Sequence, residues 1–224
     1  SAHVLKKESM VKLPVVFYNR PTQEEVIADS IDLRNKLEKD AKIEFDLNQR
    51  YIRPIVLFQA QPKNEEDSLT FEKIKQKLIN AGIPANQIAI KTSKLNELVN
   101  VDLMDQNCEI RYIITVNALK EGWDCSFAYI LASLANRSSS VDVEQILGRI
   151  LRLPNTVRSS SNFLNMSYVF TSSANFRNTL ENIVDGLNNA GFSKKDCISS
   201  SSVEEPKEEG KPKTINIFET SYDE

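Results

Sequence analysis

The chain has 224 residues, of which 41% are hydrophobic and 26% are charged, and a formal net charge of -3 at pH 7. These values are ordinary for a soluble globular protein, and no apolar run approaches the roughly 18 residues that a membrane span needs. The single histidine and the widely spaced Cys108, Cys125 and Cys197 argue against a disulfide framework and a structural zinc site, so we expect a cytoplasmic protein that holds no metal.

The first 51 residues are expected to form an N-terminal extension. Residues 11–18 contain an apolar run with Pro14 near its start, which predicts a short strand. Thr22 precedes two glutamates, a pattern typical of a helix start. The apolar stripe that follows predicts a helix to about Lys39.

Strand patterns recur between residues 52 and 192, which are expected to form one domain. Short buried strands are predicted at residues 55–60, 88–90, 109–116, 128–133 and 166–170. Helical patterns alternate with them, and this favours an α/β fold with a parallel sheet of five or six strands. Residues 193–224 are rich in Ser, Glu, Lys and Pro and are expected to form a disordered linker.

The helices of this domain are less regular than its strands. A helix capped by Asp67 or Ser68 should end at Gly82. Residues 95–107 are expected to be irregular, with a short helix. A last helix is predicted at about residues 173–191, with its apolar face toward the core.

Residues 145–152, with the sequence QILGRILR, carry a glutamine and two arginines at intervals of three and four. The apolar residues around them recur at helical spacing, so Gln145, Arg149 and Arg152 should share one face of a helix that stops at Pro154. Guanidinium groups are always charged and fork onto phosphate oxygens, so this face suits a nucleotide phosphate. A helix with ordinary surface arginines would have the same pattern.

A second polar stretch, NALKEGWDC at residues 117–125, follows the predicted strand that ends at Val116. Gly122 permits a tight backbone or the close approach of a ligand. The carboxylate of Asp124 could accept hydrogen bonds from a ribose. Trp123 could stack on a base, although packing within the loop is the more common role of such a residue.

Together these two stretches resemble motifs V and VI of superfamily 2 helicases and translocases. The order VNALKEGWDC and then QILGRILR is most similar to the helicase subunit of type III restriction enzymes. The nucleotide-excision-repair helicase subunit has a similar motif V. The resemblance is strongest between residues 55 and 152, and it implies a RecA-like lobe, the second lobe of a helicase motor, with the N-terminal helix between the two lobes.

The resemblance implies catalytic roles for three residues of the first stretch. Arg152 and Arg149 would act as arginine fingers on the γ-phosphate of ATP. Gln145 would form a hydrogen bond near the γ-phosphate or near the attacking water.

The nucleotide itself would contact Gly122, Asp124 and Gly148. The implied cofactor is ATP with Mg²⁺. Because the sequence has neither a GxxxxGK loop nor an acidic pair for the metal, the first lobe would hold most of the phosphates and the magnesium ion.

Seven residues would contact DNA by the same resemblance: Gln59, Lys91, Thr92, Ser93, Thr115, Asn117 and Lys120. The family usually has a threonine where this chain has Val116, and Thr115 is the hydroxyl beside it. A core strand with a polar exit at Gln59, and a solvated turn at residues 91–94, would have the same sequences.

The predicted function is that of the second motor lobe of an ATP-dependent DNA translocase, from the restriction subunit of a type III restriction-modification enzyme. Hydrolysis and DNA cleavage would belong to the complete enzyme, and this chain alone should be inactive. Its partners would be duplex DNA, the first lobe of the same protein and a methyltransferase subunit. Two alternatives remain: a lobe of another superfamily 2 helicase acting in DNA repair or on RNA, and a catalytically inactive RecA-like interaction module.

Overall fold

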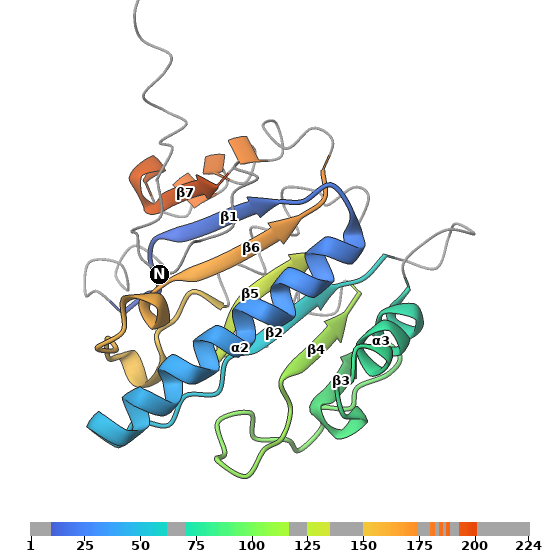
Figure 1. Ribbon diagram of the computed structural model, residues 1–224, viewed down its shortest axis with the longest axis horizontal. Helices are drawn as coiled ribbons and strands as arrows, with labels where there is room; N and C mark the ends of the chain where they lie inside the picture. The colour runs from blue at the N-terminus through green and yellow to red at the C-terminus, as the bar shows by residue number, and fades with distance from the viewer. Residues whose placement is uncertain are drawn as a thin grey trace, which may run out of the picture.

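The computed structural model (Figure 1) describes residues 10–61, 70–116, 125–134, 150–173 and 193–200, together with residues 180, 181, 184, 185, 187 and 188. Within these residues seven strands form one sheet in the order β3-β4-β2-β5-β6-β1-β7. Every pairing between neighbours is parallel. The predicted α/β class, a parallel sheet flanked by helices, is confirmed.

The strands follow the apolar runs of the sequence. They are β1 (Val15–Asn19), β2 (Ile55–Gln59), β3 (Ile88–Lys91), β4 (Tyr112–Thr115), β5 (Ala128–Ser133), β6 (Ser167–Thr171) and β7 (Cys197–Ser200). Every residue of β2, β4, β5 and β6 is buried. Continuous burial is expected where both faces of a parallel sheet are covered.

The sheet includes strands from outside the 52–192 range expected for the domain. β1 pairs with β6 on one side and with β7 on the other. The sheet is therefore completed by one strand that precedes this range and one that follows it.

Two helices cover one face of the sheet (Figure 1). Helix α2 (Gln23–Asn48) packs across β2, β5 and β6, and helix α3 (Phe71–Asn80) packs on β4. The predicted start of α2 is confirmed, because the side chain of Thr22 accepts a hydrogen bond from the Glu25 amide at 3.2 Å. The helix is longer than the sequence predicts, since its buried stripe continues beyond Lys39 through Ala41 and Glu44.

The start of α3 and the loop at residues 95–107 differ from the prediction. The N-cap of α3 is Thr70, two or three residues after the predicted caps, and its hydroxyl accepts from the Lys73 amide. Residues 95–107 contain turns and no helix. The side chains of Asn96, Asp102 and Asp105 each accept a hydrogen bond from the amide two residues later, an arrangement that competes with helix formation.

The described residues between 180 and 188 are helical, in agreement with the last predicted helix. Leu180, Val184 and Leu187 are buried, as the apolar periodicity requires.

Candidate functional site

Polar residues end the central strands at one edge of the sheet. Gln59 at the end of β2 is in register with Thr115 of β4 and with Ser133 of β5, and Thr115 is in register with Lys91 of β3. We call the row Lys91, Thr115, Gln59 and Ser133 the carboxyl edge. The fold thus brings together three of the predicted DNA-binding residues: Gln59, Lys91 and Thr115.

The chain changes direction across the sheet at this edge. From β2 it continues to β3 on one side, and from β5 it continues to β6 on the other, although β2 and β5 are neighbours. Ligands of open α/β sheets bind outside the carboxyl ends of the strands at such a point. The geometry therefore makes the carboxyl edge the candidate site.

Neutral amides and hydroxyls form the centre of the carboxyl edge. Gln59 is 3% exposed, and its Oε1 accepts a hydrogen bond from the Ser133 hydroxyl at 3.0 Å. The Leu134 carbonyl accepts from the side-chain amides of Gln61 (2.8 Å) and Gln23 (2.9 Å). Gln59 is thus buried and already paired with Ser133, so a contact from its side chain to nucleic acid would require a local rearrangement.

Thr115 occupies a different environment on the same edge. Its side chain is 1% exposed, and its hydroxyl is buried and has no hydrogen-bond partner among the residues that the structure describes. Thr115 lies two residues before the segment 117–124. Asn117, Lys120, Gly122 and Asp124 fall in that segment, outside the described residues.

The turn after β3 presents a cation at the end of the carboxyl edge. The Thr92 hydroxyl accepts hydrogen bonds from the amides of Lys94 (3.3 Å) and Leu95 (2.9 Å), which closes the turn. Ser93 and Lys94 are exposed, and Lys91 is half-buried. Of the predicted contacts, Thr92 therefore shapes the turn, while Ser93 is open to a ligand.

Lys94 was not among the predicted contacts, although it is the most accessible cation of this turn. The sequence signal was present in the two lysines that flank Thr92 and Ser93. What the sequence could not show is that Lys91 is the half-buried member of the pair and Lys94 the exposed one.

A second cation lies at the carboxyl end of β1, and the sequence did not single it out. The Arg20 guanidinium lies over the rings of Tyr18 (5.2 Å to the centroid) and Phe170 (5.6 Å), which stack on each other. Arg20 also pairs with Asp29 of α2. Burial raises the pKa of the Tyr18 hydroxyl, although nearby Arg20 acts in the opposite direction, so the ring remains a neutral platform.

Arg152 lies elsewhere in the molecule. It forms an antiparallel bridge with Val11, beside hydrogen bonds from the Lys12 amide to the Leu151 carbonyl and from the Leu153 amide to the Met10 carbonyl. The prediction that Arg152 lies on a helical face is therefore wrong, because this pairing makes residues 151–153 extended. Gln145, Gly148 and Arg149 fall outside the described residues.

The position of Arg152 follows from its neighbour Lys12. The Lys12 ammonium is fully buried, donates to the Ser126 and Ala128 carbonyls at 2.8 and 2.6 Å, and lies over the Tyr129 ring. Because β5 begins at Ala128, Lys12 marks the amino edge of the sheet. A six-residue strand is roughly 16 Å long, so the backbone of Arg152 is separated from the carboxyl edge by about that length. Its side chain is exposed.

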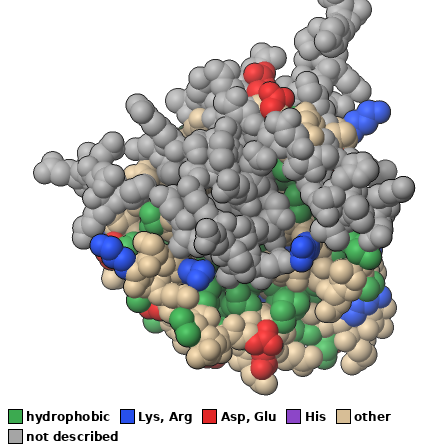
Figure 2. Space-filling model, turned by 180° about the vertical axis from the view of Figure 1, so that it is seen from behind, with side chains coloured by type: hydrophobic (Ala, Val, Ile, Leu, Met, Phe, Trp, Pro, Cys, Tyr) green, Lys and Arg blue, Asp and Glu red, His purple; other side chains and the backbone are tan. Residues whose placement is uncertain are grey.

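One further face of the molecule carries described side chains of several types (Figure 2). On the face opposite to α2 and α3, the coloured residues of Figure 2 show hydrophobic side chains and a few separate Lys and Arg groups, without a continuous basic patch. The described residues contain no group of three His, Cys, Asp or Glu side chains that could hold a metal ion. None of the helices in this part of the chain has the length and apolar character that a membrane crossing requires.

Comparisons with known proteins give distant structural similarities. No family model matches the sequence, and no curated protein matches it. The solved structures that resemble this chain include Saccharomyces cerevisiae Dbp5 bound to RNA and ADP BeF3, with 12% identity and a TM-score of 0.46 over 84% of this chain and 42% of that one. The ATP-dependent type ISP restriction-modification enzyme LlaBIII bound to DNA has 13% identity and a TM-score of 0.48, over 87% of this chain and 15% of that one. Mycobacterium smegmatis helicase Lhr bound to ssDNA and AMP-PNP has 12% identity and a TM-score of 0.39, over 80% and 22% of the two chains. This chain thus spans less than half of each of these three proteins, and at such identities and TM-scores its function has to be inferred from its own residues.

Proposed function

We propose that this chain is the second, RecA-like lobe of an ATP-dependent DNA translocase of helicase superfamily 2, from the restriction subunit of a type III restriction-modification enzyme. In this proposal the carboxyl edge of the sheet faces DNA, and Arg152 faces the nucleotide bound by the first lobe.

The observation that carries the proposal is the position, in the sheet, of the two strands that precede the motif-bearing segments. Residues 117–124 follow β4 directly, and residues 135–149 follow β5 directly. β4 and β5 are the two neighbours of β2. The strands β4 and β5, which precede these two segments in the chain, therefore end on either side of the central strand β2, at the edge where open α/β sheets bind ligands.

The dimensions and charge of this edge suit a nucleic-acid backbone. The row of strands from β3 to β1 crosses five spacings, or about 24 Å, which is about seven base pairs of duplex. Lys91 and Lys94 lie at one end of the row and Arg20 at the other. Phosphates would pair with these cations, while the neutral amides between them would form the floor.

The nucleotide side of the proposal depends on Arg152. Arg152 is exposed, and a guanidinium is the kind of group that stabilises the charge of a transferring phosphoryl group. ATP bound with Mg²⁺ by the first lobe would supply the phosphoryl group. In this proposal the first lobe holds the magnesium ion. The remaining predicted ATP ligands are Gln145, Arg149, Gly148, Gly122 and Asp124.

The DNA contact can be tested on this chain alone. Fluorescence anisotropy with a labelled 20-base-pair duplex at several salt concentrations gives the affinity and its salt dependence. Replacing Lys91 and Lys94 by alanine should weaken binding and lower the salt slope by about two, because each lost phosphate contact contributes about 0.9. The matched control replaces two exposed lysines of α2, Lys36 and Lys39. Equal slopes in both double variants would remove the turn after β3 from the interface.

The motor role needs a protein that joins this lobe to a first lobe with a phosphate-binding loop. We expect DNA-stimulated ATP turnover that falls about 10³- to 10⁵-fold in Arg152→Ala, while ATP still binds. Arg158→Ala, an exposed arginine six residues away, is the control. Stimulation by RNA instead of DNA would favour another superfamily 2 helicase, and absence of turnover in the unaltered protein would favour an interaction module.

A further inference from the structure

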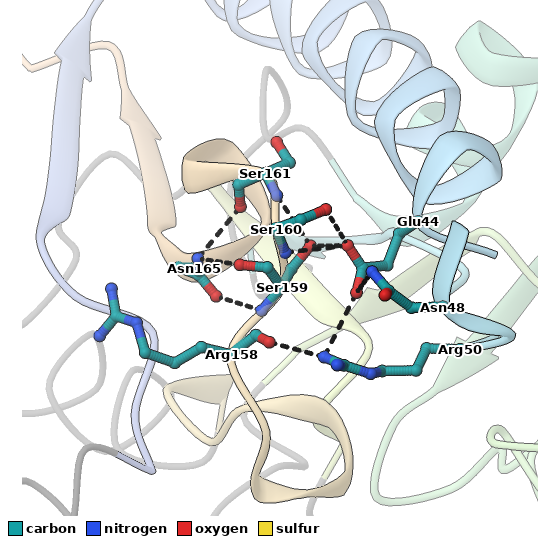
Figure 3. A network of polar contacts seen from close by, with 8 residues as sticks. All are labelled: Glu44, Asn48, Arg50, Arg158, Ser159, Ser160, Ser161 and Asn165. Carbon is teal, nitrogen blue, oxygen red and sulfur yellow. Dashed lines mark hydrogen bonds and ion pairs between the residues drawn. The ribbon is translucent and has the colours of Figure 1, made fainter. Parts of the chain in front are cut away.

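A buried carboxylate ties the segment that follows Arg152 to helix α2. Residues 158–161, which we call the serine loop, lie against the C-terminal part of α2 (Figure 3). Oε2 of Glu44 accepts hydrogen bonds from the Ser159 hydroxyl (2.7 Å), the Ser160 amide (2.9 Å) and the Ser160 hydroxyl. A fourth hydrogen bond comes from the side-chain amide of Asn48, which donates to Glu44 Oε1 at 3.1 Å.

The charge of Glu44 is balanced at the same place. Arg50 lies 3.3 Å from Glu44 Oε1 and also donates to the Arg158 carbonyl at 2.6 Å, so it bridges the helix end and the serine loop. Glu44 is 1% exposed. Burial disfavours its charged form, but the hydrogen bonds from Ser160 and Ser159 outweigh this, and the pKa of the carboxyl lies below its usual range. The Glu44 carboxylate is therefore ionised at neutral pH.

The serine loop is also held from its other side. Oδ1 of the buried Asn165 accepts from the Ser159 amide at 2.8 Å, and its Nδ2 donates to the Ser159 and Ser161 carbonyls at 2.9 and 3.1 Å. The Ser161 hydroxyl donates to Asp40 of α2. The serine loop is thus held by hydrogen bonds from both its side chains and its backbone.

This arrangement fixes both ends of the stretch that contains Arg152. On one side, residues 151–153 pair with residues 10–12. On the other side, the serine loop begins six residues after Arg152 and is fastened to Glu44. Leu153 and Pro154, between the two attachments, are buried. The exposed residue Arg152 therefore belongs to a backbone stretch that is held on both sides.

We propose that Glu44 is a positioning residue for Arg152, acting through the serine loop to hold the arginine in the direction that the nucleotide requires. The inference rests on the proposed function of Arg152, and it assigns to α2, a helix more than 100 residues earlier in the chain, a part in the ATP site. Glu44 itself touches no substrate in this proposal.

A merely structural role would give a different result from a positioning role. If Glu44 only stabilised the fold, its replacement would lower the melting temperature and leave the turnover of the remaining folded protein unchanged. If it positions Arg152, its replacement should lower kcat by about 10- to 100-fold with KM for ATP and the DNA affinity nearly unchanged, because the misplacement of a catalytic group by about 1 Å has effects of this size.

The first measurement is hydrogen exchange on this 224-residue chain, which needs no ATP turnover. Glu44→Gln leaves one accepting oxygen in place of two and removes the charge, so the donors of the serine loop and those of Asn48 and Arg50 cannot all be satisfied. In this variant the amides of Ser160 and Leu153 should exchange at least about tenfold faster than in the unaltered chain. The amides of β2 and β5 should be unchanged. Trypsin should also cleave faster after Arg158. The matched control is Asp46→Asn, an exposed acid on the same helix.

The second measurement is ATP turnover in the two-lobe protein. We expect a lower kcat in Glu44→Gln, no effect in Asp46→Asn, and a double variant Glu44→Gln, Arg152→Ala that is no slower than Arg152→Ala alone. The double variant Ser159→Ala, Ser160→Ala removes two hydroxyl donors but keeps the carboxylate, and should show the same effects in weaker form. It also tests the proposal if Glu44→Gln does not fold.

The outcomes separate the two proposals. Normal turnover in Arg152→Ala would overturn the proposed function itself. Reduced turnover in Arg152→Ala together with normal turnover and unchanged exchange in the Glu44 and serine variants would overturn only the positioning role.

Discussion

Replacing Arg53 by alanine should destabilise the fold more than any surface substitution. The Arg53 guanidinium is 1% exposed, at the entrance to β2. It donates to the carbonyls of Leu103 (2.6 Å), Asp105 (2.9 Å) and Ile110 (2.8 Å), and to the Tyr51 hydroxyl (3.1 Å). It therefore ties the loop before β4 to the strand beside it.

The size of the effect follows from the environment of each acceptor. The bond to Leu103 is buried, and a bond from a charged donor there is worth about 1.5–3 kcal/mol. The bonds to Asp105 and Ile110 are only partly buried, so water can replace the guanidinium, and each should contribute about 0.5–1 kcal/mol. We expect Arg53→Ala to lower the free energy of unfolding by about 3–4 kcal/mol, a large part of the 5–15 kcal/mol typical of a domain.

Urea unfolding followed by circular dichroism measures this difference. Arg53→Lys, which keeps the charge but has one donor group in place of the planar fork, should lose about half as much. Arg158→Ala should change the free energy by less than about 0.5 kcal/mol, since its side chain is exposed. A loss below about 1 kcal/mol in Arg53→Ala would refute the view that this guanidinium organises the loop.

Three further predictions concern other buried or capping groups. Because the folded-state pKa of Glu44 is depressed, its stabilisation is present above the unfolded-state pKa of about 4.3 and is lost as the pH falls through the folded value. The difference in unfolding free energy between the unaltered chain and Glu44→Gln should therefore be largest near pH 7 and shrink below about pH 4, and a difference independent of pH would contradict this. Lys12→Met keeps an unbranched side chain, one atom shorter, but removes the two bonds to carbonyls, and should lower the unfolding free energy by about 1–3 kcal/mol in urea titrations. An increase would show that the cost of burying the charge exceeds the stabilisation from its hydrogen bonds. Thr22→Ala removes the N-cap of α2 and should cost about 1 kcal/mol, with Thr22→Ser as the variant that restores stability.

Local sequence patterns were sufficient for most of the secondary structure. The buried runs that become β2, β4 and β5 consist of consecutive apolar residues, and such runs identify strands of a parallel sheet from neighbouring residues alone. The start of α2 was predictable for the same reason, since the capping hydroxyl of Thr22 and the amide it binds are three residues apart. The carboxyl edge then follows, because parallel strands end at the same side of a sheet.

The end of α2 and the conformation of Arg152 were not predictable in this way. Glu44 interrupts the apolar stripe of the helix, and it is buried only because the serine loop, 115 residues later, supplies the hydrogen bonds that a buried carboxylate needs. Arg152 has a helical pattern on its N-terminal side, but the backbone bridge to Val11 makes it extended.

The sequence by itself determined the α/β class, the positions of the central strands and the two motif stretches that suggest a motor lobe, because these depend on composition and on spacing along the chain. Only the tertiary structure decided that β1 and β7 complete the sheet, that Gln59 and Thr115 are buried at the carboxyl edge, and that Arg152 lies near the opposite edge. The physical reason is that each of these depends on hydrogen bonds and burial between segments far apart in sequence, whose partners no local pattern identifies.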